Sequence, residues 1–156
     1  MGNKAIELLW VVAVSAILVV LTYFILDESG LFGPAVLGMA AIPILVARFN
    51  KIPLTSLIPD STFGSIDTGL LTLGAVIGAL GYGVLGAIVG GVVADAITDA
   101  IAGFFEGGIA EWLRSRGIEE ARTALGSAGG KMAGCLAGSG LMLSILQVLG
   151  LEIQNI

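Results

Sequence analysis

The sequence contains no histidine and a single cysteine, and these two absences exclude several kinds of site. Without histidine, the chain lacks a common ligand for zinc and copper and the usual proton shuttle at neutral pH. Cys135 alone provides neither a disulfide within the chain nor a thiolate metal cluster. Any ion site must therefore use carboxylates, hydroxyls and main-chain carbonyls, which are hard oxygen ligands.

Charged residues are also scarce, at 12% of the 156 residues, whereas 56% are hydrophobic. The mean hydropathy of +1.02 is far above that of a soluble domain with a polar surface, so we expect an integral membrane protein. The net charge of -5 argues against nucleic-acid binding, which needs a basic surface. No stretch remains for a soluble catalytic domain, and we expect the protein not to be an enzyme.

Apolar runs predict an all-α integral membrane protein with about five transmembrane helices. The runs cover about residues 5–26, 31–47, 63–82, 83–105 and 126–150. Pro43 should kink the second run, and Gly81-Tyr82-Gly83 suits a tight turn between the third and fourth. We expect an N-terminal transmembrane hairpin at residues 1–50 and a glycine-rich, acid-containing three-helix core at residues 63–150.

Basic residues predict the orientation, because lysine and arginine collect in cytoplasmic connections. With five spans and a cytoplasmic N-terminus, all the basic residues fall on or near one side: Lys4, Arg48, Lys51, Arg114, Arg116, Arg122 and Lys131. The first run is too long for a signal-peptide core, and no arginine-rich leader precedes it. We therefore expect a multi-pass protein of a prokaryotic inner membrane.

Three aspartates stand inside the predicted spans, where each charge costs about 2.5 to 3.5 kcal/mol on insertion scales. Asp67 lies in the third run, and Asp95 and Asp99 lie in the fourth. Because the fourth run returns through the membrane, Asp67 and Asp99 should share a depth. Helical spacing places Asp95, Asp99 and Glu106 on one face, with Glu106 near the headgroups.

These acids predict an oxygen-only cation site, whose candidate ligands are Asp67, Asp95, Asp99, Thr68, Thr98 and Glu106. Mutual repulsion and lost hydration prevent three aspartates from ionising together unless a cation or protons are bound. The ligands suit sodium, calcium, magnesium or protons, and no organic cofactor is expected. Glycines repeat every four residues from Gly126 to Gly138, which lets helices pack closely enough for short acids to meet.

Three stretches resemble the transmembrane protein 65 family: FGSIDTGLL at 63–71, VVADAITDAIAGFFEGGIAEWL at 92–113 and GGKMAGCLAGSGLMLSIL at 129–146. The resemblance implies a membrane protein associated with sodium-dependent calcium extrusion, in a family of the mitochondrial inner membrane that also occurs in prokaryotes. By motif it assigns Asp67, Asp95, Thr98 and Asp99 to the site. The family pattern has asparagine in place of Thr68 and Asp95 and serine in place of Thr98, which leaves the ion selectivity open.

We therefore predict a homodimeric cation transporter, of the sodium/calcium exchange or proton-coupled type, with calcium or sodium bound. Three alternatives stay open. Glycine stripes also suit a structural or assembly protein without ion dependence. The stretch GVVADAITD resembles the second half of the CDP-alcohol phosphotransferase motif, although the first half is missing. A proteolipid-like rotor ring would have one acid in each hairpin, whereas this chain has three aspartates in its predicted spans.

Overall fold

The computed structural model describes residues 4–28, 31–117 and 123–151. Within these ranges, the main chain alone is described at residues 26–28, 102, 103, 105, 106, 110 and 113. Its elements are α1 (Lys4–Glu28), α2 (Phe32–Met39), α3 (Ala41–Phe49), the 3-10 helix η1 (Leu54–Leu57), α4 (Ile58–Ser115) and α5 (Ala124–Val148). These ranges contain no strand. The predicted all-α class is confirmed for the described residues.

Four helical stretches in these ranges are long and apolar enough to cross a membrane: Lys4–Ile25, Phe32–Phe49, Leu54–Ile101 and Ala124–Val148. Many of their large apolar side chains are exposed, among them Leu9, Val19, Leu85, Val92 and Val148. An apolar surface of this extent suits contact with lipid rather than with water. The helices therefore fit a multi-pass membrane protein.

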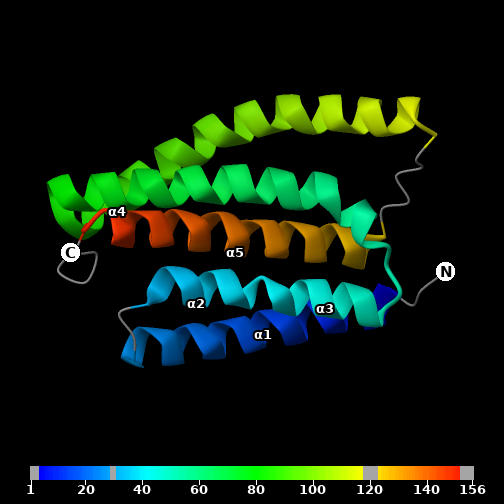
Figure 1. Ribbon diagram of the computed structural model, residues 1–156, viewed down its shortest axis with the longest axis horizontal. Coiled ribbons are helices and arrows are strands. Elements are labelled where there is room, and N and C mark those ends of the chain that lie inside the picture. The colour runs from blue at the N-terminus through cyan, green and yellow to red at the C-terminus, as the bar shows by residue number, and fades with distance from the viewer. Residues whose placement is uncertain (1–3, 29–30, 118–122, 152–156) are drawn as a thin grey trace.

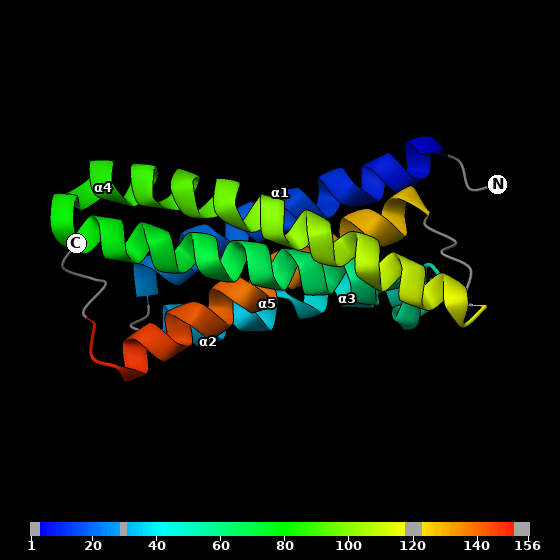
Figure 2. The same cartoon turned by 90° about the horizontal axis from the view of Figure 1, so that it is seen from above.

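The long helix α4 reverses direction near its middle, where Tyr82 (φ -139°, ψ 20°) and Gly83 (φ 59°, ψ -145°) leave the helical conformation. Glycine adopts the positive φ at this position without the steric strain that a side chain would add. Figures 1 and 2 show the two halves of α4 running antiparallel from this turn. We call residues 58–81 the first arm and residues 84–115 the second arm. The reversal lies where the sequence predicts a turn.

The helix α5 is the centre of the fold, since α1, α2, α3, η1 and α4 all pack against it. Figure 1 shows the first arm on one side of α5, α2 and α3 on the other, and the second arm as an outermost layer. A Cβ atom at Gly134 or Gly138 would overlap the main chain of Ser61 or Ser65, respectively. The first arm and α5 are therefore in backbone contact.

Pro43 interrupts the second membrane-crossing stretch. Proline has no N–H to donate to the carbonyl four residues earlier, which here belongs to Met39. The helix α2 ends at Met39 and α3 begins at Ala41, so the helix is interrupted three residues before Pro43, where the sequence predicts a kink. A separate hydrogen bond joins the start of α2 to the end of α5, in which the Gly33 N–H donates to Oε1 of Gln147 at 3.1 Å.

One predicted boundary is wrong, because α4 begins at Ile58 rather than near residue 63. Pro59 and Asp60 suit the first turn of a helix, where proline needs no partner for an N–H and a carboxylate faces the positive end of the helix dipole. Hydropathy finds the apolar run and misses this polar first turn. Asp60 therefore belongs to the helix and not to the preceding connection. The division into residues 1–50 and 63–150 stays a prediction.

Candidate cation site in the α4 hairpin

Glycines hold the two arms of α4 in contact. A Cβ at Gly78 would overlap the carbonyl oxygen of Gly86, and a Cβ at Gly90 would overlap that of Gly74. The two pairs are four residues apart on each arm, so the same side of each helix faces the other along the hairpin. Such small-residue stripes let helix backbones approach closely within a membrane. Polar side chains further along these stripes must therefore meet as well.

Thr98 and Asp67 make the polar contact between the arms. The Thr98 hydroxyl lies 2.5 Å from Oδ1 of Asp67 and 3.1 Å from the main-chain carbonyl oxygen of Asp95. Thr98 is only 1% exposed, which places this contact in the interior of the hairpin. A hydrogen bond shielded from water is stronger electrostatically than one at a wet surface. The structure thus joins two of the predicted site residues directly.

Asp95 and Asp99 lie beside this contact on the second arm. The carboxyl group of Asp95 is partly exposed and within electrostatic reach of those of Asp67 and Asp99. Asp99 is exposed. Within the part of the chain that the structure describes, no three acidic, histidine or cysteine side chains come together as a metal-binding group. Asp67, Asp95 and Asp99 are therefore neighbours, but within one chain their carboxyl groups do not meet at a single point.

Thr68 lies apart from the Asp67–Thr98 contact. Its hydroxyl donates to the Gly64 carbonyl oxygen at 2.9 Å, within the first arm. The hydroxyls of Thr72 and of Ser139 on α5 lie 2.7 Å and 3.3 Å from the Thr68 carbonyl oxygen, and these two hydroxyls lie 2.9 Å from each other. Thr68 therefore belongs to a group of hydroxyls between the first arm and α5.

Glu106 cannot be assigned a position in the site in the same way. Its main chain belongs to the second arm, but its side chain lies outside the described residues. Its part in cation binding stays a prediction.

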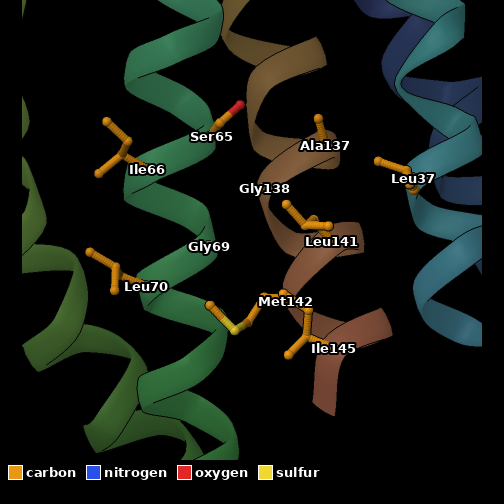
Figure 3. Close-up of a pocket in the computed structure, with 10 residues that line it drawn as sticks. All are labelled: Leu37, Ser65, Ile66, Gly69, Leu70, Ala137, Gly138, Leu141, Met142 and Ile145. Atoms are coloured by element: carbon orange, nitrogen blue, oxygen red, sulfur yellow. The ribbon is translucent and has the colours of Figure 1, made fainter. Parts of the chain in front are cut away.

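A groove beside the first arm has a different chemistry. It encloses about 410 Å³ between the first arm, α5 and α2, and Ser65 is the polar side chain on its wall (Figure 3). None of the predicted ligands lines it. The remaining lining residues are Leu37, Ile66, Gly69, Leu70, Ala137, Gly138, Leu141, Met142 and Ile145. Such a surface suits an apolar chain and not a cation.

Sequence reasoning missed one buried acid, Asp60. This residue is 1% exposed, and neither of its carboxylate oxygens has a hydrogen-bond partner among the described residues. The sequence Pro59-Asp60-Ser61-Thr62 has the composition of a polar connection, so it does not suggest that Asp60 is buried. A signal was nonetheless present, because Asp60 lies seven residues before Asp67, on the same side of a helix.

Comparison with known proteins adds no assignment. No protein-family model matches the chain, and no curated protein or solved structure shows significant similarity to it. The resemblance to the transmembrane protein 65 family therefore stays a prediction from short motifs. Function must be argued from the residues themselves.

Proposed function

We propose that this chain is a cation transporter with five membrane crossings, in which each arm of α4 crosses once and the hairpin handles the ion. The observation that carries the proposal is the contact between Thr98 and Asp67, with Asp95 and Asp99 beside it. All four residues lie in the apolar stretch Leu54–Ile101. Acids at such a depth are costly, and they are typical of ion and proton pathways.

The hydrogen bonds of Thr98 support a role for protons. Its hydroxyl has one proton and two acceptors in range, Oδ1 of Asp67 and the carbonyl oxygen of Asp95. An ionised Asp67 accepts this proton, whereas a protonated Asp67 donates to Thr98, which then donates to the Asp95 carbonyl. Both states keep Thr98 and Asp67 partnered. Exchange of a proton on Asp67 for a bound cation, with the proton passing to water, therefore needs no rearrangement of the helices.

The ligand chemistry favours sodium or calcium as the transported cation. Carboxylate, hydroxyl and carbonyl oxygens are the groups that these hard ions prefer. One chain offers few of them at one point, and calcium takes six to eight oxygen ligands. A shared site between chains supplies more ligands than a single hairpin.

Exposure of the second arm supports a homodimer. Figure 1 shows this arm as the outermost layer, and Asp99 is exposed on it. A second copy packed against this surface would shield Asp99 from lipid and contribute its own Asp95 and Asp99. The proposed site is thus completed at a two-fold interface, where each chain supplies the same groups.

The distribution of basic residues supports a cytoplasmic N-terminus. Lys4 begins α1, Arg48 lies in the last turn of α3, Arg114 lies in the last turn of α4, and Lys131 lies near the start of α5. These helix ends lie at one end of the molecule in Figure 1. The positive-inside rule assigns such an end to the cytoplasm, and we propose a prokaryotic inner membrane. Arg122 lies outside the described residues.

Ion flux into liposomes that contain the full chain tests the proposal, with sodium, calcium and proton gradients applied separately. We expect Asp67→Asn to abolish flux, because amide nitrogen neither ionises nor releases a proton, and Asp95→Asn and Asp99→Asn to reduce it. Glu7→Gln, an acid in the first turn of α1, is the matched control and should transport normally. Wild-type flux in all three aspartate variants would reject the site.

A structural or assembly protein is the second candidate, favoured by the backbone contacts of Gly78 with Gly86 and of Gly138 with Ser65. Such a protein has no need of an ion at the hairpin. Any difference in its Tm between sodium, calcium and choline salts at equal ionic strength should therefore be the same in the wild type and in Asp67→Asn. A cation-specific rise of the Tm that Asp67→Asn removes favours the transporter, because a ligand stabilises the state that binds it.

A further inference from the structure

Asp60 is buried and has no hydrogen-bond partner among the described residues, whereas Asp95 and Asp99 of the hairpin are partly exposed and exposed, respectively. It is 1% exposed, and both of its carboxylate oxygens lack a hydrogen bond. Asp67, by contrast, has the hydroxyl of Thr98. A buried polar group without a partner costs free energy that native proteins rarely tolerate. The Asp60 carboxylate is therefore a candidate to bind an ion or another ligand.

Three elements close around Asp60. It lies in the first turn of α4, next to η1, and Gly130 of α5 packs against both. A Cβ at Gly130 would be 2.9 Å from the Cβ of Asp60 and 3.1 Å from the carbonyl oxygen of Leu57. Lys131 follows Gly130, but it is exposed and its ammonium lies 5.1 Å from the ring centre of Phe63. It makes no hydrogen bond to Asp60.

A cation satisfies Asp60 more fully than a proton does. A protonated carboxyl becomes a donor through one oxygen, and its other oxygen still lacks a hydrogen-bond donor among the described residues. In the first turn of α4 the Asp60 carboxylate also lies at the positive end of the helix dipole. A bound cation satisfies both oxygens and keeps the charge that the dipole stabilises.

A monovalent cation matches the charge of this position. One carboxylate balances one positive charge, whereas calcium or magnesium would leave an unbalanced buried charge, which is costly. The Leu57 carbonyl oxygen and the Cβ of Asp60 border the same glycine, so a neutral oxygen lies at the same helix contact as Asp60. We propose that Asp60 anchors a second cation site, for sodium, at the junction of η1, α4 and α5. This site is separate from the hairpin site and does not depend on transport.

Thermal unfolding of the full chain in detergent tests this site, with sodium chloride compared with choline chloride at equal ionic strength. We expect sodium to raise the Tm of the wild type, since a ligand that binds the folded state stabilises it. The part of this rise that belongs to Asp60 should be lost in Asp60→Asn, which keeps the shape of the side chain and removes its charge. A sodium-dependent rise should remain in Asp67→Asn, where only the hairpin site is impaired, so that failure of the hairpin site and failure of this site are distinguished.

Several outcomes would overturn the inference. They are a wild type that is insensitive to sodium, an equal sodium effect in Asp60→Asn, and a response to calcium alone that Asp60→Asn removes. If Asp60→Asn does not fold, the variant with asparagine at positions 67, 95 and 99 decides. A sodium effect that persists in that variant supports Asp60, and its loss assigns the effect to the hairpin.

Discussion

Replacement of Thr98 by valine removes the hydroxyl that joins the arms of α4 and keeps the shape of the side chain. Thr98 is 1% exposed, so water does not take the place of its hydroxyl, although Asp67 itself is partly exposed. An acceptor left unsatisfied in a protein interior costs about 1 to 3 kcal/mol. Hydrogen bonds between membrane helices average about 0.6 and reach about 1.7 kcal/mol. We expect Thr98→Val to lower the free energy of unfolding by about 1 to 1.7 kcal/mol, where these two ranges overlap.

A double-mutant cycle assigns this loss to the pair. Unfolding in mixed micelles with increasing sodium dodecyl sulfate, followed by circular dichroism, gives the free energies of Thr98→Val, Asp67→Ala and the double variant. We expect a coupling energy of about 1 kcal/mol or more, because the second substitution removes a partner already lost. Thr98→Ser should retain most of the coupling. A coupling within about 0.5 kcal/mol of zero, the scatter for independent sites, would refute the contact.

Two glycine substitutions test the packing by the same unfolding measurement. Gly138→Ala should lower the free energy of unfolding by about 1 to 3 kcal/mol or more, because its Cβ overlaps the main chain of Ser65. The control is Gly38→Ala, whose Cβ would have no atom within 4 Å. Equal stabilities of the two variants would contradict the close approach of Gly138 to Ser65. Gly83→Ala should cost about 1 to 3 kcal/mol, since the φ and ψ of this turn suit glycine. Gly81→Ala should cost little, and a Gly83→Ala protein as stable as the wild type would argue against the turn.

The helical architecture follows from the sequence because a membrane restricts the choices. Backbone groups in hydrocarbon must be bonded within the chain, and a long apolar run therefore becomes a helix. The two interruptions of the helices have local causes, because Pro43 lacks an N–H and Gly83 adopts a positive φ. Both are visible in the sequence without knowledge of neighbouring helices. The start of α4 at Ile58 is different, because its first turn is polar and hydropathy gives it no weight.

The pairing within the site depends on information that one helix does not contain. Spacing alone puts Asp95 and Asp99 on one face, yet the interface with the first arm is centred on Thr98 between them. The rotation of the second arm is fixed by its glycine contacts, such as that of Gly90 with Gly74. The burial of Asp60 likewise comes from Gly130, seventy residues later in the chain.

Exposure of Asp99 connects ion binding to assembly in the proposed transporter. A carboxylate that faces lipid costs about 2.5 to 3.5 kcal/mol per chain, and burial against a second copy removes that contact. In a two-fold interface, however, Asp99 and Asp95 of one chain approach acids of the other, and like charges repel. A cation between them turns this repulsion into attraction. Cation binding and dimerisation should therefore stabilise each other, and removal of cations should shift the protein towards monomers.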